Sequence, residues 1–158
     1  MNKKNFVIQL ISVLLVALWV YAAVSKLQEF NAFHEQLHRQ PLPSWTPGFL
    51  VWGLPLIELI AAGLLLFQRF RGVGIWLSFL LMLLFTGYVG LAVVGVWDDV
   101  PCACGGVISQ LGWEGHLLFN LFFTILTGVG VFVWKQKRSG DSGGDAASGE
   151  AAYPSGGR

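Results

Sequence analysis

Residues 73–96 read VGIWLSFLLMLLFTGYVGLAVVGV and contain no Asp, Glu, Lys or Arg. At a rise of about 1.5 Å per residue, an α-helix of about 20 apolar residues crosses the roughly 30 Å hydrocarbon core of a bilayer. A helix also satisfies its own backbone hydrogen bonds, which lipid cannot do. The run therefore predicts a transmembrane helix over residues 73–96.

Three further apolar segments of similar length lie along the chain. They cover residues 6–24, 49–67 and 116–134, and the second of them contains Glu58. The chain of 158 residues is 54% hydrophobic and only 12% charged, whereas about one quarter of a soluble domain is charged. One such segment could be a buried helix of a soluble protein, but four in succession leave too few charges for a surface in water. We predict an all-α, polytopic membrane four-helix bundle formed by residues 1–138.

The two ends of the chain differ in character. The first apolar segment follows Lys3 and Lys4, as in a secretory signal, but it is longer than the roughly 7–15 residues of a signal core and no clear cleavage site follows it. We therefore expect it to be retained as the first membrane helix. After Arg138 the chain is mainly Ser, Gly, Asp and Ala, which bury too little apolar surface to offset the entropy of ordering. Residues 139–158 are predicted to be a disordered cytoplasmic tail.

The Lys and Arg residues predict the orientation of the bundle, because cytoplasmic loops carry an excess of positive charge. The end with both termini holds seven of them: Lys3, Lys4, Arg69, Arg71, Lys135, Lys137 and Arg138. The opposite end holds only Lys26 and Arg39. Both termini are therefore expected in the cytoplasm, and the loop over residues 97–115 in the periplasm of a bacterial inner membrane. The net charge of +1, without a basic cluster for phosphates, argues against a nucleic-acid partner.

The loop between the first two membrane segments contains a short amphipathic piece. Over residues 27–37, one helical face collects the apolar side chains Leu27, Phe30, Phe33 and Leu37. This pattern predicts a short outward helix that lies on the membrane surface. His34 and His38 stand one turn apart on it. Their spacing suits a shared metal ion, but such a pair is more often part of a polar face.

Cys102 and Cys104 are the two cysteines of the chain, and a single residue separates them. A disulfide between them closes a small ring of distorted geometry, and such strain makes a disulfide easier to reduce and a better exchange partner. A structural disulfide usually closes a longer loop. Gly105 and Gly106 follow and leave the backbone free to turn sharply. The pair therefore favours thiol–disulfide exchange, with metal binding by soft thiolates or an inert pair as the alternatives.

Three ionisable residues accompany the cysteines as candidate site residues. Glu58 lies in the middle of its apolar segment, where an ionised carboxylate costs about 2.5–3.5 kcal/mol, so it should face the bundle and stay protonated or find a partner. A functional role and a purely structural hydrogen bond between helices are equally open interpretations of Glu58. Lys26 and His116 are both on the outward side, and either cation would favour the thiolate if it lay near the cysteines. The favoured alternative for Lys26 is snorkelling to the headgroups, whereas Asn120, one turn after His116, is predicted to bond between helices.

Several of these residues belong to motifs that recur in one family. The motifs are SKLQEFNAF at 25–33, PLIEL at 55–59, PCACGGV at 101–107 and LGWEGHLLFN at 111–120. Together they resemble the MauE branch of the DoxX-like membrane proteins over residues 6–134. That family is similar in outline to four-helix thiol oxidoreductases of the vitamin-K-epoxide-reductase type, and its best-known member assists maturation of methylamine dehydrogenase, whose small subunit is rich in disulfides.

The resemblance implies a role in forming or moving periplasmic disulfides. It carries the cysteine motif onto Cys102 and Cys104, the buried acid onto Glu58 and the histidine after the loop onto His116. We therefore expect a membrane thiol–disulfide relay with these residues and Lys26 as its site and a periplasmic thiol or disulfide protein as its partner.

Other parts of this expectation are less specific. A membrane quinone is a candidate electron acceptor, although no motif for one is present, and no resident metal is expected. Whether the relay is an enzyme stays open. The main alternative is a non-enzymatic accessory or scaffold subunit of a larger periplasmic or membrane complex, and copper or zinc handling is a weaker one.

Overall fold

The computed structural model describes residues 3–40, 43–96 and 112–150, and the regular elements in these ranges are all α-helices. The helices are α1 (Lys3–Gln28), α2 (Phe30–His38), α3 (Thr46–Leu66), α4 (Arg71–Val93) and α5 (Gly112–Glu150). Four of them, α1, α3, α4 and the Glu114–Ser139 part of α5, are long and apolar enough to cross a membrane. The predicted all-α polytopic architecture with four spans is confirmed, and each span lies over its predicted segment.

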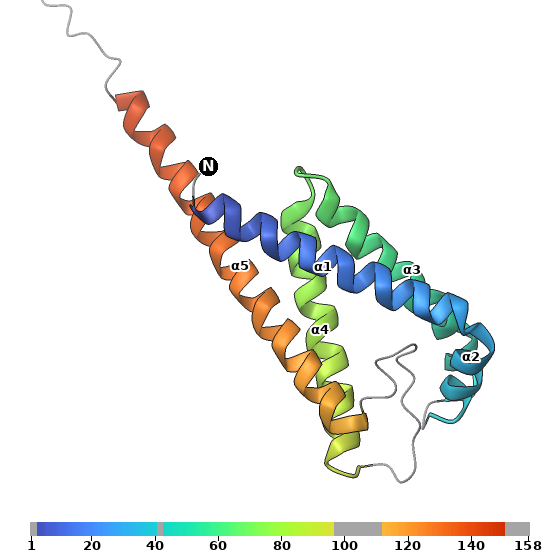
Figure 1. Ribbon diagram of the computed structural model, residues 1–158. Helices are drawn as coiled ribbons and strands as arrows, with labels where there is room; N and C mark the ends of the chain where they lie inside the picture. Colours follow the sequence, from blue (N-terminus) through green and yellow to red (C-terminus); the bar gives the residue numbers. More distant parts are fainter. Residues whose placement is uncertain (1–2, 41–42, 97–111, 151–158) are drawn as a thin grey trace, which may run out of the picture.

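The four long helices pack side by side in a ring (Figure 1). The most extensive contacts join α4 to α5 and α1 to α3, and further contacts join α3 to α4 and α1 to α5. Because successive long helices run in opposite directions, the end of α1, the start of α3, the end of α4 and the start of α5 lie toward the same end of the bundle. The site described below lies toward this end.

The bundle core is apolar, but most of each helix surface points outward. Ile11 and Leu15 of α1 pack with Leu65 of α3, Ile75 of α4 and Val131 of α5. In the most apolar 18-residue stretch of each span, only 22–39% is buried inside the protein. The remaining exposed apolar area is far larger than soluble monomers tolerate, and a bilayer would cover it.

Polar contacts also join the spans. Trp19 Nε1 of α1 donates a hydrogen bond to Ser78 Oγ of α4 at 2.9 Å. The hydroxyls of Thr86 in α4 and Thr124 in α5 are 2.7 Å apart. Such bonds hold membrane helices together in lipid, where burying apolar surface between helices gives little driving force.

The predicted short helix between the first two spans is present as α2, and its apolar face has a protein partner. Phe33 and Leu37 are buried and pack against Val51 of α3. Gln40, two residues beyond the end of α2, is also tied to the bundle, because the Tyr88 hydroxyl of α4 donates a hydrogen bond to Gln40 Oε1. The sequence shows the amphipathic stripe, whereas the packing shows that α3 covers its Phe33 and Leu37.

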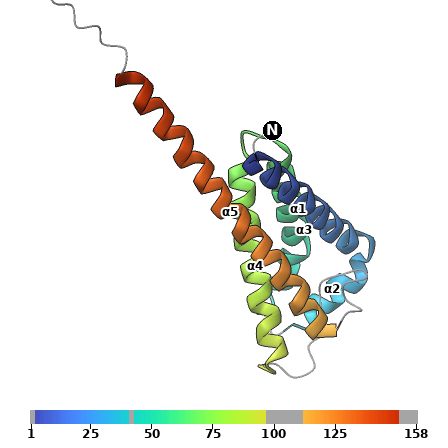
Figure 2. The ribbon, with the colours of Figure 1, turned by 60° about the vertical axis from the view of Figure 1, so that its left-hand side comes forward.

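Residues 139–150, the first part of the predicted tail, belong to α5 in the structure. Helix α5 continues to Glu150 and projects beyond the other helices (Figure 2). Extending an existing helix avoids the unfavourable nucleation step that an isolated segment of this composition would face. The predicted disordered tail covers residues 139–158, of which 151–158 lie outside the described residues.

Candidate functional site

A buried ion pair joins α1 to α3 inside the bundle. Lys26 Nζ lies 2.7 Å from Glu58 Oε1, and the two side chains are only 6% and 1% exposed. Lys26 Nζ also donates a hydrogen bond to the carbonyl oxygen of Ala22 at 3.3 Å and lies 6.0 Å from the ring centre of Phe33 in α2. Glu58 therefore faces the bundle and has a partner, as predicted, whereas the favoured expectation that Lys26 snorkels to the headgroups is wrong.

Helix periodicity explains why both charged residues point inward. The buried face of α3 includes Val51, Pro55, Glu58 and Leu65, which follow one another at intervals of three, four or seven residues. These intervals keep side chains on one face of a helix, so Glu58 falls within the apolar stripe that packs on α1. Lys26 likewise ends the buried stripe of α1, since it lies three residues after the buried Ala23.

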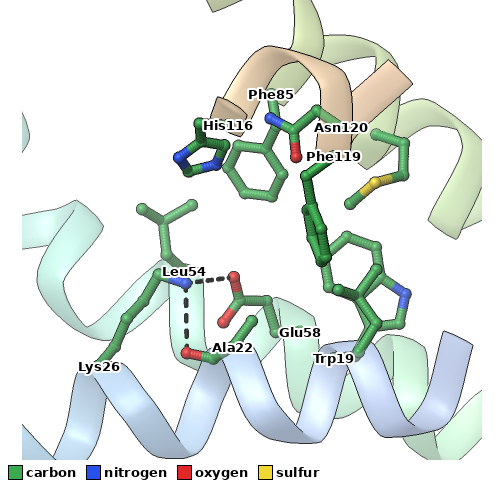
Figure 3. A pocket seen from close by; sticks show the side chains of 11 residues that line it. Trp19, Ala22, Lys26, Leu54, Glu58, Phe85, His116, Phe119 and Asn120 are labelled. Carbon is green, nitrogen blue, oxygen red and sulfur yellow. Dashed lines mark hydrogen bonds and ion pairs between the residues drawn. The ribbon is translucent and has the colours of Figure 1, made fainter. Parts of the chain in front are cut away.

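A small pocket opens beside this pair (Figure 3). Its volume is about 70 Å³, and polar side chains reach it from three helices: Lys26 from α1, Glu58 from α3, and His116 and Asn120 from α5. Aromatic rings form much of the remaining wall and belong to Trp19, Phe85 and Phe119. A pocket of this size and polarity has room for a few water molecules or one small polar group.

Two buried polar atoms at the pocket lack a hydrogen-bond partner within the described part of the chain. They are Glu58 Oε2, an acceptor, and Asn120 Nδ2, a donor. Leaving such an atom unpaired costs about 1–3 kcal/mol, so native proteins rarely do so without a reason. The pocket therefore complements a group that donates one hydrogen bond and accepts another.

His116 belongs to the same pocket. It is 4% exposed and lies one turn before Asn120, near the start of α5. In Figure 3 the two α5 side chains face Lys26 and Glu58 across the pocket. Within the described ranges no group of three or more His, Cys, Asp or Glu side chains could hold a metal ion, so His116 does not form such a cluster with His34 and His38.

The structure thus brings together three of the five predicted site residues, namely Lys26, Glu58 and His116. Cys102 and Cys104 lie outside the described residues, so their place at the site stays a prediction. The unpaired amide of Asn120 was not foreseen, although its position one turn after His116 was a usable signal. The aromatic walls were also missed, because nothing in the sequence separates a ring that lines a pocket from one that faces lipid.

The fold and the site together define the chain as a polytopic helical membrane protein with a charged, partly unsatisfied pocket toward one end of its bundle. Residues 4–133 match the family model of MauE, described as methylamine utilisation protein MauE. The chain therefore belongs to the MauE family, which confirms the resemblance seen in its motifs. No curated protein and no solved structure matches the chain.

Proposed function

We propose that the chain is a thiol–disulfide relay of the bacterial inner membrane that acts through Cys102 and Cys104 on the periplasmic side. The observation that carries the proposal is the Lys26–Glu58 pair beside a pocket with one unpaired donor and one unpaired acceptor. An ionisable pair inside a membrane bundle is expensive and marks a functional site by default. The segment that carries both cysteines joins α4 to α5, and α5 supplies His116 and Asn120 to the pocket within its first turns.

The relay chemistry is an exchange of two electrons and two protons. A thiolate of the client protein attacks one sulfur of the Cys102–Cys104 disulfide, which forms a mixed disulfide and releases the other cysteine as a thiolate. The client's second thiolate then attacks the mixed disulfide. The client leaves with a new disulfide, and Cys102 and Cys104 are left reduced.

Reoxidation of the two cysteines requires an acceptor for the two electrons and two protons. We assign this role to a membrane quinone, which becomes a quinol as the cysteines return to the disulfide. A quinone oxygen can accept a hydrogen bond from Asn120 Nδ2, and a quinol hydroxyl can also donate one to Glu58 Oε2. The pocket of about 70 Å³ is smaller than a cavity of roughly 150 Å³ that binds benzene. It therefore fits only the oxygen-bearing edge of the quinone ring.

The family description gives the biological setting of the proposal. A MauE-type accessory protein would serve methylamine utilisation, and the client would be an exported protein that needs disulfides to mature. The competing function is a non-enzymatic accessory subunit, for which the cysteines shape a loop and take no part in electron transfer.

The test is redox trapping of the cysteines in intact cells. Cys102→Ser and Cys104→Ser should each trap or abolish mixed disulfides with a periplasmic protein and leave the client reduced, whereas Ser109→Ala, in the same segment, should change neither. In the unsubstituted protein, quinone depletion should leave both cysteines reduced, and a membrane-impermeant maleimide should then label them from the periplasmic side. If the client stays oxidised in both Ser variants, the relay is refuted and the accessory-subunit function is favoured.

A further inference from the structure

A pair of histidines on α2 lies outside the pocket and takes no part in the proposed relay. His34 and His38 are one helical turn apart, with their Nε2 atoms 3.3 Å from each other. The ring centroids are 4.5 Å apart, and the rings are inclined at 62°. His38 is exposed and His34 is half-buried. Two ring nitrogens thus lie close together at the surface of the protein.

The separation of the two nitrogens suits a shared ion. With Zn–N distances of about 2.0–2.1 Å and a tetrahedral angle at the metal, two ligating nitrogens stand about 3.3–3.4 Å apart. The same separation also allows one ring to donate a hydrogen bond to the other, and a bound ion would replace that bond. The observed distance between the two Nε2 atoms therefore matches the distance between two ligands of a tetrahedral metal ion, without any change of helix geometry.

The surrounding structure holds this geometry in place. Phe33 and Leu37, each next to one of the histidines in sequence, are buried against α3 and anchor the helix that presents both rings. The Phe30 ring stacks on His34 at 6.3 Å and 20°. His38 is the last residue of α2, where the helix dipole favours a bound cation. Because these contacts already order α2 and the His34 ring, less conformational entropy remains to be lost on binding.

We propose that His34 and His38 form a binding site for a tetrahedral transition-metal ion such as Zn²⁺. Imidazole nitrogen is a preferred zinc ligand. No group of three or more ligating side chains occurs among the residues that the structure describes. The pair therefore supplies two ligands and leaves two positions to solvent or to a donor atom of another molecule. Such an open site binds its ion reversibly. It does not depend on the relay, and either proposal can fail alone.

The test is zinc titration of the full-length protein in detergent micelles, with both cysteines blocked by N-ethylmaleimide so that thiolates contribute nothing. We expect a single Zn²⁺ per chain by isothermal titration calorimetry. His34→Ala and His38→Ala should each weaken binding at least about tenfold, since even the loss of a group that only orients a ligand costs about 10–100-fold. Glu35→Gln, on the same helix, is the matched control and should bind like the parent. Absence of binding by the parent, or binding by both Ala variants as tight as that of the parent, would overturn the site.

A second measurement needs no substitution and so does not depend on how the variants fold. Diethyl pyrocarbonate modifies accessible imidazoles, and mass spectrometry locates the modified residues. Zn²⁺ should protect His34 and His38 together, at the concentration that saturates the calorimetric titration. If both histidines are modified at the same rate with and without Zn²⁺, the proposed site does not exist.

Discussion

Removing the two partners of the buried ion pair should have unequal effects. In Lys26→Met, Glu58 keeps its position eight residues from the nearer end of α3, which is about 12 Å along the helix. Its short side chain cannot reach water from there. Removing one partner of a buried pair costs about 3–5 kcal/mol, and this is the loss expected in the free energy of unfolding.

Glu58→Gln should cost less. Lys26 is two residues from the end of α1, so its long side chain can carry the ammonium to the headgroups once the carboxylate is gone. We expect a loss of about 1 kcal/mol, the value of one ordinary hydrogen bond. In the double variant Lys26→Met/Glu58→Leu no charge remains buried, and such replacements are often neutral or stabilising. The double variant should therefore be more stable than Lys26→Met alone.

The assay is chemical unfolding of the four proteins in detergent micelles, followed by circular dichroism. Adding the single variant Glu58→Leu completes a double-mutant cycle with the parent, Lys26→Met and the double variant, and this cycle separates the coupling between the two side chains from their individual effects. The reasoning would be refuted if Glu58→Gln lost as much stability as Lys26→Met, or if the double variant were the least stable of the set.

Three further substitutions test the packing and the pocket. In Gly72→Ala the new Cβ would lie 2.5 Å from the Trp134 indole, so overpacking should cost about 1–3 kcal/mol; Gly63→Ala, with no heavy atom within 4 Å, should not lower the melting temperature. Phe33→Ala should remove about 3–5 kcal/mol of packing between α2 and α3, and limited proteolysis should then cut α2 faster than in the parent. Asn120→Leu removes an unpaired buried donor and should raise the melting temperature while slowing reoxidation of the cysteines. If reoxidation is unchanged in Asn120→Leu, the pocket takes no part in the relay.

The sequence alone determined the architecture and the family. Lipid requires about 20 apolar residues for each crossing, so the run over residues 73–96 was sufficient to find α4, which spans Arg71–Val93. The same rule located the other three spans, and the helical spacing of apolar residues such as Phe33 and Leu37 predicted α2. The motifs around Glu58 and His116 identified the MauE family, because a set of motifs at given spacings can be recognised without knowing which residues are in contact.

Tertiary structure alone decided which groups meet. The sequence showed that Glu58 required a partner, but Lys26 is 32 positions away, and a residue in the last turn of α1 can face either lipid or α3. The rotation of each helix about its axis settles that choice, and it depends on packing with all neighbouring helices at once. For the same reason the sequence could not show that α3 covers α2, or that Asn120 Nδ2 stays unpaired beside Glu58.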